Sequence, residues 1–405
     1  MKKVRVLNLT TRLGLFILIL GLGTVAALIV GETKGLALAD LSGVSVQVMA
    51  SEGEVLYAGL SGGSRPTGIY RSDDRGRTWQ VISSGPGMAI NTLAIHPIHN
   101  AILYAGTAGG PLGANNVWRS DDGGQIWHNF NLSLPTNSNR TIPAVTAIVA
   151  DPNQPEILYI GTDGQGVYRV IEGQLGFELI EGMSLSDSHI KQLELGSDRC
   201  LYAVTNAGLF VTIDHTWQKI ESLPEVLVSL TVASNDSQIL YAGCPTSGAY
   251  RSMDGGQTWE SINNGLELIP GVASRITALA VDKRDSQHVV AGTAYGVGSR
   301  LVSDGIYESR NGGHHWSKAC DADGLVRQLI VDQSAIFAAT SNGLVCTGQS
   351  PQGSLTIFLP DLVQLAHPTG SQTLILVLAV GLGALVLLGR TEWLTWRDPG
   401  GEDEN

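Results

Sequence analysis

The sequence predicts an all-β protein built as a single seven-bladed β-propeller. Three observations predict it. The 405 residues include 50 glycines but only 15 prolines, many short apolar runs are separated by turn residues, and one unit recurs along most of the chain. The formal net charge of −12 argues against binding to nucleic acid, which needs clustered Lys and Arg.

The recurring unit is clearest in its second apolar run, which reads Leu-Tyr-Ala-Gly in its best copies. Successive copies lie roughly 40 to 55 residues apart, close to the length of one propeller blade. The seven copies are Leu56–Gly59, Leu103–Gly106, Leu158–Gly161, Leu201–Val204, Leu240–Gly243, Val289–Gly292 and Ile336–Ala339. Each copy is expected to form the second strand of a blade.

Apolar runs before and after each copy predict the neighbouring strands. The innermost strands are expected at residues 44–49, 90–95, 145–150, 190–195, 227–232, 276–281 and 326–331. The run after each copy carries an aromatic residue in six of the seven units, which indicates a packing position between blades. With a fourth run in each unit the propeller spans residues 41–360, and Leu355–Leu359 is expected to complete the last blade. Closing the ring removes exposed sheet edges.

Four units continue into the pattern Ser-x-Asp-x-Gly-x-Thr-Trp or a close copy of it. Glycine suits the positive φ of a tight turn, a short acidic side chain accepts bonds from the turn's N–H groups, and tryptophan packs between layers. A structural role without chemistry is therefore expected for these residues. They are Ser72, Asp74, Gly76, Trp79, Ser120, Asp122, Gly124, Trp127, Ser252, Asp254, Gly256, Trp259, Ser309, Asn311, Gly313 and Trp316.

This pattern resembles the Asp box of BNR repeats, which occur in sialidases, sortilin-type receptors, xyloglucan hydrolases and photosystem II assembly factors. The resemblance covers residues 41–360 and implies a propeller of the sortilin/sialidase-like, WD40/YVTN/BNR-like kind with Asp-box hairpins. Photosystem II assembly factors are the most similar in size and plan, as single seven-bladed propellers on the exported side of a membrane. Xyloglucan hydrolases use two tandem propellers, whereas this chain has room for one.

Both ends of the chain carry apolar segments outside the predicted propeller. Residues 1–39 are predicted to be a signal peptide cut after Ala39 or an uncleaved signal-anchor helix. After a linker at 361–372, residues 373–389 are predicted to form a transmembrane helix, with a buried helix as the alternative. Residues 390–405 then form a cytoplasmic tail, so the protein is expected to be membrane-anchored with its propeller on the extracytoplasmic side.

The four cysteines show no metal-binding spacing, so neither a metal nor a cofactor is expected. A disulfide between Cys320 and Cys346 and a pair of buried free thiols both remain open.

The resemblance places a ligand site on the face opposite the Asp boxes, where five long loops are expected at 61–67, 107–116, 131–143, 263–274 and 293–305. Lys191 and Arg327 occupy matching places on two innermost strands and are expected to line the channel. The full set of candidate binding residues is Arg65, Asn115, Asn116, Arg140, Arg275, Tyr295, Arg300, Lys191 and Arg327.

No catalytic residue is assigned from the sequence. The arginine motif that opens the sialidase fold is missing, and a pair of carboxylates for glycoside hydrolysis is not assignable. The resulting hypothesis is a non-catalytic binding or assembly platform, similar to photosystem assembly factors, with a protein or membrane complex as partner and no nucleic acid. The alternatives are a glycoside hydrolase of sialidase-like or xyloglucanase-like type, with a glycan as ligand, and a sortilin-like peptide receptor.

Overall fold

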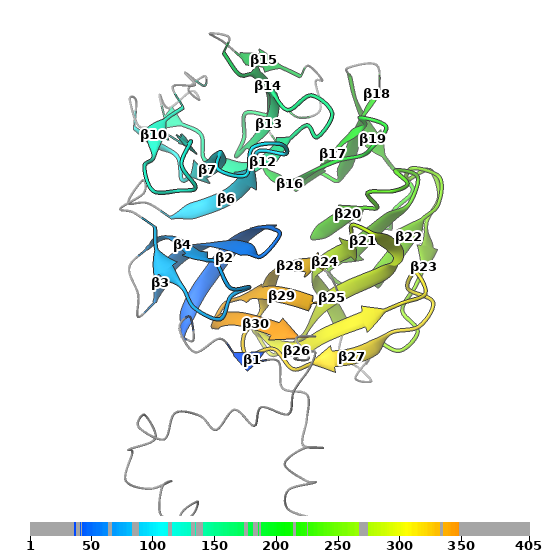
Figure 1. Ribbon diagram of the computed structural model, residues 1–405. Coiled ribbons are helices and arrows are strands. Elements are labelled where there is room, and N and C mark those ends of the chain that lie inside the picture. The colour runs from blue at the N-terminus through cyan, green and yellow to red at the C-terminus, as the bar shows by residue number, and fades with distance from the viewer. Residues whose placement is uncertain are drawn as a thin grey trace, which may run out of the picture. The chain divides into compact units, whose positions relative to one another are not determined.

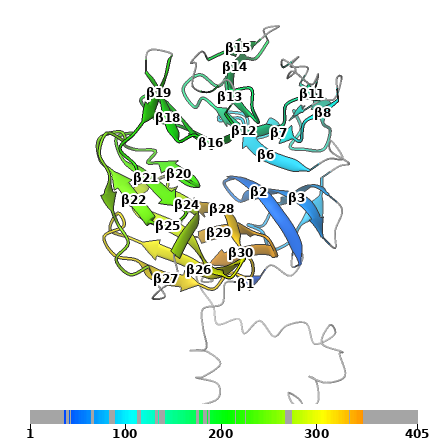
Figure 2. The same cartoon turned by 180° about the vertical axis from the view of Figure 1, so that it is seen from behind.

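Seven four-stranded antiparallel sheets surround a common centre in the computed structural model, as Figure 1 shows from one side and Figure 2 from behind. This confirms the all-β, seven-bladed propeller. The structure describes residues 36–37, 41, 43–63, 67–82, 89–111, 116–130, 134, 141–173, 177–180, 185, 188–213, 216–224, 226–266, 274–332 and 335–347.

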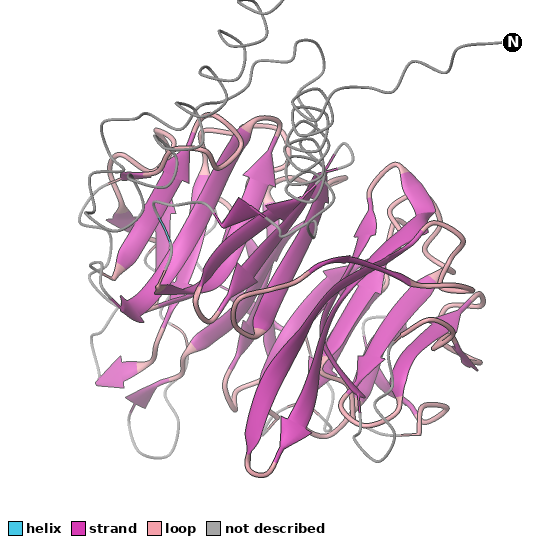
Figure 3. Cartoon of the chain, turned by 90° about the horizontal axis from the view of Figure 1, so that it is seen from below, coloured by secondary structure: helices cyan, strands magenta, loops and turns pink. Residues whose placement is uncertain are grey.

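These residues form strands and loops and contain no α-helix (Figure 3). No helix in this described part of the chain is long and apolar enough to cross a membrane. The predicted transmembrane helix at 373–389 and most of the segment 1–39 lie outside the described residues.

Six blades run in chain order from an innermost to an outermost strand. The first two are β2 (Val44–Glu52), β3 (Val55–Gly63), β4 (Gly68–Ser72) and β5 (Gln80–Val81), then β6 (Ile90–Ile95), β7 (Leu103–Thr107), β9 (Val117–Ser120) and β10 (His128–Asn129). Blades 3 and 4 are β12 (Val145–Ala150), β13 (Ile157–Thr162), β14 (Val167–Ile171) and β15 (Phe177–Leu179), then β16 (Ile190–Leu195), β17 (Leu201–Thr205), β18 (Leu209–Ile213) and β19 (Thr216–Ile220).

Blades 5 and 6 are β20 (Ser229–Val232), β21 (Leu240–Cys244), β22 (Gly248–Ser252) and β23 (Glu260–Ser261), then β24 (Ser274–Asp282), β25 (Asp285–Val297), β26 (Arg300–Ser309) and β27 (Ser317–Cys320). Two short strands, β8 (Gly110–Pro111) and β11 (Thr141–Ile142), pair with each other and join the loops 107–116 and 131–143.

The seventh blade combines both ends of the propeller sequence. Its inner three strands are β28 (Val326–Asp332), β29 (Ala335–Thr340) and β30 (Gly343–Thr347), and its outermost strand is β1 (Leu36–Ala37), antiparallel to β30. The strand expected to complete this blade, Leu355–Leu359, lies outside the described residues. Because β1 precedes Ala39, a cut after that residue would remove it.

Seven hydrophobic clusters form the core, each made by two adjacent blades. The aromatic residue of the third strand contacts the preceding blade: Tyr168 of β14, for example, packs with Tyr104 of β7, and Phe210 of β18 with Ile157 of β13. These contacts confirm the packing position that the sequence predicts for the aromatic residue.

The glycine that ends most second runs also belongs to these interfaces. A Cβ atom at Gly243 would lie 2.5 Å from Cγ2 of Ile276, near the start of β24, the innermost strand of the next blade. A Cβ atom at Gly106 would likewise lie 2.6 Å from Cγ1 of Val145, the first residue of β12. Real Cβ atoms do not approach so closely, so the glycine allows neighbouring blades to pack together.

The four Ser-x-Asp/Asn-x-Gly-x-x-Trp segments, which we call the box turns, connect third and fourth strands. In the third of them, Ser252 Oγ donates to Asp254 Oδ1 at 2.7 Å, and the Thr258 and Gly256 amides donate to Asp254 Oδ1 and Ser252 Oγ at 2.9 and 2.8 Å. Trp259 Nε1 donates to the Gly256 carbonyl at 3.0 Å. The polar side chains of this turn therefore bond to the turn itself.

Candidate functional site

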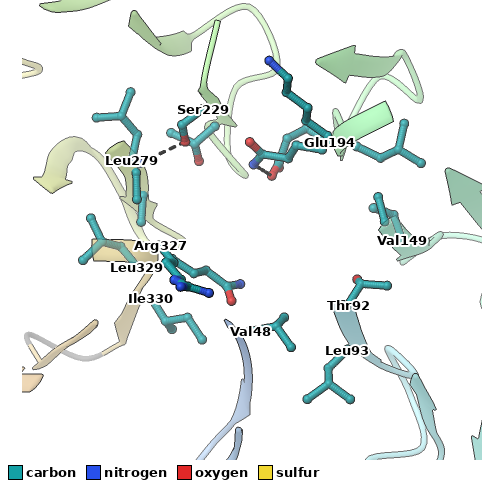
Figure 4. Close-up of a pocket in the computed structure, with 18 of the residues that line it drawn as sticks. Val48, Thr92, Leu93, Val149, Glu194, Ser229, Leu279, Arg327, Leu329 and Ile330 are labelled. Carbon is teal, nitrogen blue, oxygen red and sulfur yellow. Dashed lines mark hydrogen bonds between the residues drawn. The ribbon is translucent and has the colours of Figure 1, made fainter. Parts of the chain in front are cut away.

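The innermost strands of the blades enclose a central cavity of about 450 Å³ (Figure 4). All seven of them, β2, β6, β12, β16, β20, β24 and β28, contribute lining residues. Apolar side chains, including Leu93, Leu279 and Leu329, form much of its wall. The cavity is therefore built by the fold as a whole and not by a single loop.

Six of the seven innermost strands are interrupted by a β-bulge near their first residue. A bulge places an extra residue opposite the partner strand and redirects its side chain. Each of these six strands has a polar residue at a bulge that lines the cavity, whereas Ser45, at a second bulge of β2, does not line it. The six lining residues are Gln47, Asn91, Thr146, Lys191, Thr277 and Arg327, which we call the bulge ring.

Four members of the bulge ring use polar atoms to hold the strands in place. Asn91 Nδ2 donates to the Val145 carbonyl of the next blade at 3.2 Å. Thr146 Oγ1 and Thr277 Oγ1 donate to backbone carbonyls of their own blades at 3.3 and 3.1 Å, and Gln47 Nε2 donates to Ser45 Oγ at 3.1 Å. These four side chains stabilise the bulges.

Lys191 and Arg327 behave differently. Both side chains are exposed in the cavity, and neither forms a hydrogen bond or ion pair with any residue that the structure describes. The surrounding walls lower the pKa of Arg327 through burial, although a guanidinium stays charged at neutral pH. The bulge ring therefore contains two cations with free hydrogen-bond donors and no acidic residue.

The residue after a bulge links neighbouring innermost strands. Gln192 Oε1 accepts from the Leu230 amide at 3.1 Å, and Gln328 Oε1 accepts from the Met49 amide at 2.6 Å. Between blades 5 and 6, where β20 has no bulge, Ser229 Oγ accepts a hydrogen bond from the Leu279 amide at 3.0 Å (Figure 4). These bonds satisfy backbone groups at strand edges that face the cavity.

Glu194 of β16 is the single carboxyl group among the described residues that line the cavity. Burial between the walls raises its pKa to about 7, against the lowering effect of a hydrogen bond from Gln192 Nε2 at 2.8 Å. Figure 4 shows Glu194 and Arg327 entering the cavity from different strands. A second cavity shares Leu93 and Lys283 with the first and adds Glu52, at the end of β2.

The structure describes only some of the candidate binding residues predicted on the loop face. Arg65, Asn115 and Arg140 lie outside the described residues. Asn116 is buried, and its Nδ2 donates to the Pro143 carbonyl at 2.7 Å, which ties two loops together. Its contacts are structural.

Arg275, Tyr295 and Arg300 all belong to blade 6, on the adjacent strands β24, β25 and β26. The expected loop 293–305 is instead a β-hairpin, in which Tyr295 pairs with Val302 and Gly296 with Leu301. The loop prediction was wrong, because the strand pairing continues through Gly296 and the chain turns only at Gly298. These three residues lie on one extended sheet and do not reach the cavity lining.

Sequence reasoning missed Glu194 and most of the bulge ring. A signal for most of the ring was present, because Asn91, Thr146 and Thr277 are the second residues of their runs, as Lys191 and Arg327 are; Gln47 is the fourth residue of its run. No comparable signal marked Glu194, whose pKa depends on walls contributed by other blades.

The described residues include no group of His, Cys, Asp and Glu that could hold a metal ion. Cys200 is a partly exposed free thiol, and Cys320 is buried. The side chain of Cys346 lies outside the described part, so its disulfide with Cys320 stays a prediction.

No known protein-family model matches the chain. The chain is 27% identical over 255 residues to the xyloglucanase Xgh74A of Acetivibrio thermocellus, a match that covers 48% of this chain and 28% of the relative. It is 23% identical over 210 residues to the oligoxyloglucan-reducing end-specific xyloglucanase of Emericella nidulans, covering 45% and 25%. The chain thus matches little more than a quarter of the length of these relatives.

Two solved structures show the same architecture. The GH74 enzyme of Niastella koreensis superposes with a TM-score of 0.59 at 16% identity, over 78% of this chain and 53% of that one. YCF48 bound to D1 peptide superposes with a TM-score of 0.55 at 14% identity, over 77% and 95%. At these identities the likeness establishes the propeller fold alone.

The comparisons contradict the hypothesis of a non-catalytic assembly platform, because the curated relatives are xyloglucanases. The expectation that the chain is not an enzyme is contradicted by the same finding. The alternative of a glycoside hydrolase agrees better with these relatives.

Proposed function

We propose that this chain is a glycoside hydrolase of xyloglucanase-like type. The observation that carries the proposal is the 27% identity to a xyloglucanase over 255 residues. Because the match covers 28% of that relative, the activity and the β-glucan substrate are both part of the proposal. The hydrogen bonds of the four box turns support the finer assignment to Asp-box propellers, and an export segment at 1–39 would bring the propeller to extracytoplasmic glycans.

The central cavity and the second cavity that adjoins it each supply one carboxyl group, and this reaction needs two. Most glycosidases use one carboxyl group that is protonated near neutral pH and a second that is ionised. Glu194, with a pKa of about 7, fits the first role and would protonate the departing glycosidic oxygen. Glu52, exposed in the adjoining cavity, is the candidate for the second role, which stabilises the developing positive charge or activates water.

The test is hydrolysis of xyloglucan and other β-glucans by the full-length protein, measured as release of reducing ends. Removing a general acid typically lowers kcat by about 10²- to 10⁴-fold, and we expect this for E194Q and a comparable loss for E52Q. The matched control is E54Q, since Glu54 is an exposed residue of the same hairpin as Glu52 and does not line either cavity.

The activity should also fall as the pH rises through about 7, because Glu194 then loses the proton that it donates. Wild-type rates in both E194Q and E52Q would exclude these roles. Absence of hydrolysis across the whole glycan panel would exclude the proposed activity.

A further inference from the structure

We infer that the bulge ring is a carboxylate-binding site and that it accepts an acidic sugar, such as a uronic acid residue of a glycan. The carboxylate is argued from the ring itself, whereas the sugar rests on the proposed function. The neutral backbone of a β-glucan would not by itself require cations at this place.

The first argument is charge. The protein carries a formal net charge of −12, yet the described residues that line the cavity include three cations, Lys191, Lys283 and Arg327, and one carboxyl group. A cavity of one sign with low-dielectric walls concentrates ligands of the opposite charge. The lining therefore favours an anion over a cation or a neutral ligand.

The second argument is the free hydrogen-bonding capacity of the two ring cations. A guanidinium presents a planar fork of donors that matches a carboxylate in two parallel bonds. Arg327 has no described partner for this fork, and the cavity wall limits its hydration, as its lowered pKa reflects. Lys191 lines the cavity from another blade as a second cation without a described partner. An anion bound in the ring at Arg327 would satisfy its fork, and Lys191 adds positive charge to the same cavity.

The third argument is the set of polar and apolar side chains that line the cavity together with these cations. Thr146 and Thr277 keep hydroxyl lone pairs free after donating to backbone carbonyls, and Gln47 and Asn91 carry amide groups, all of which suit sugar hydroxyls. Apolar side chains such as Leu279 and Leu329 line the same cavity (Figure 4). A volume of about 450 Å³ lies within the usual range of ligand cavities.

Calorimetric titration of the full-length protein with glucuronic acid and with glucose tests the inference. Neither monosaccharide has a glycosidic bond, so hydrolysis does not interfere. We expect glucuronate to bind at least about 10-fold more tightly than glucose, since hydrogen bonds to a charged group exceed neutral ones. R327Q should weaken glucuronate binding by about 10- to 100-fold and leave glucose binding unchanged.

Three further titrations make the result specific. K191Q should weaken glucuronate binding less than R327Q, because an ammonium does not form the paired bonds, and R327K should restore part of the affinity. K219Q is the control, since Lys219 is a surface residue paired with Glu221. Equal affinity for glucose and glucuronate, or unchanged binding by R327Q, would overturn the carboxylate site.

A titration with acetate separates the contribution of the carboxylate to the affinity from that of the sugar ring. If acetate binds as tightly as glucuronate, the sugar contributes nothing and that half of the inference fails. Hydrolysis of neutral glucans is measured independently, so a failure of the proposed activity and a failure of this site give different patterns of results.

Discussion

The bulge ring and the box turns are both sets of polar residues that recur from blade to blade, but they differ in how their side chains are used. In the box turns, Ser252 and Asp254 bond to the turn that contains them. In the bulge ring, Lys191 and Arg327 have no described partner. Recurrence alone therefore does not mark a ligand site, whereas free hydrogen-bonding capacity inside a cavity leaves donors available to a ligand.

The largest effect is expected from the pH dependence of stability at Glu194, which lines the same cavity as the bulge ring. Its pKa of about 7 in the folded protein lies above the ordinary value of 4.5, so the unfolded chain ionises first as the pH rises. Stability should fall between pH 4.5 and 7 and stay lower above pH 7, by roughly 3 kcal/mol in total.

E194Q should abolish this loss, so that its free energy of unfolding relative to the wild type rises between pH 4 and 8. Urea unfolding of both proteins across this range measures the effect, with E54Q as the control for an exposed glutamate. Parallel pH profiles for E194Q and the wild type would show that the cavity does not perturb Glu194.

A smaller effect is expected from filling the close contact between blades 5 and 6. In G243A the new Cβ would lie 2.5 Å from Ile276 Cγ2, and overpacking of this kind costs about 2 kcal/mol. G296A is the matched control, because nothing lies within 4 Å of a Cβ at Gly296. Thermal or urea unfolding compares the two, and equal stabilities would refute the close approach of blades 5 and 6.

The smallest effect is expected at a box turn. D254A removes the acceptor for Ser252 and Thr258, which should cost about 1 kcal/mol in an exposed turn. Hydrogen bonds, first that of the Thr258 side chain, lower the pKa of Asp254 to about 2. The stabilisation should therefore be complete above pH 4 and disappear as the pH falls through about 2.

D254N supplies the comparison for that turn. Asn311 already accepts from Ser309 Oγ and the His315 amide at 2.8 and 2.9 Å in the fourth box turn, so an amide fits the same geometry. D254N should be nearly as stable as the wild type at pH 7 and lose the acid dependence. A loss as large as that of D254A would mean that the charge of Asp254 stabilises the turn.

The repeating part of the fold could be predicted from the sequence because it depends on local patterns. The Leu-Tyr-Ala-Gly runs and the aromatic residue after them satisfy the same packing requirement in each blade, so they recur visibly. The strand β1 could not be predicted in this way, since two residues within an apolar N-terminal segment carry no pattern of their own. The hairpin 293–305 was missed because its glycines resemble a loop.

The candidate site was harder to predict because its properties depend on several blades together. Lys191 and Arg327 were expected in the channel from their places on innermost strands, and they line the cavity. The raised pKa of Glu194, by contrast, comes from burial by surrounding walls and leaves no trace in the run Ile190–Leu195. The absence of a recognisable carboxylate pair also led to the expectation of a protein without activity, which the xyloglucanase relatives contradict.

The pairing of β1 with β30 has a consequence for the order of folding. Leu36 and Cys346 lie at opposite ends of the propeller sequence, so among the strand pairings that the structure describes their contact closes the longest loop and is the slowest to form by chance. On the ribosome, β1 emerges first and remains without its partner until the last blade has been synthesised. The first strand of the propeller is thus the last to pair with its neighbour, and the newly made ring remains open until then.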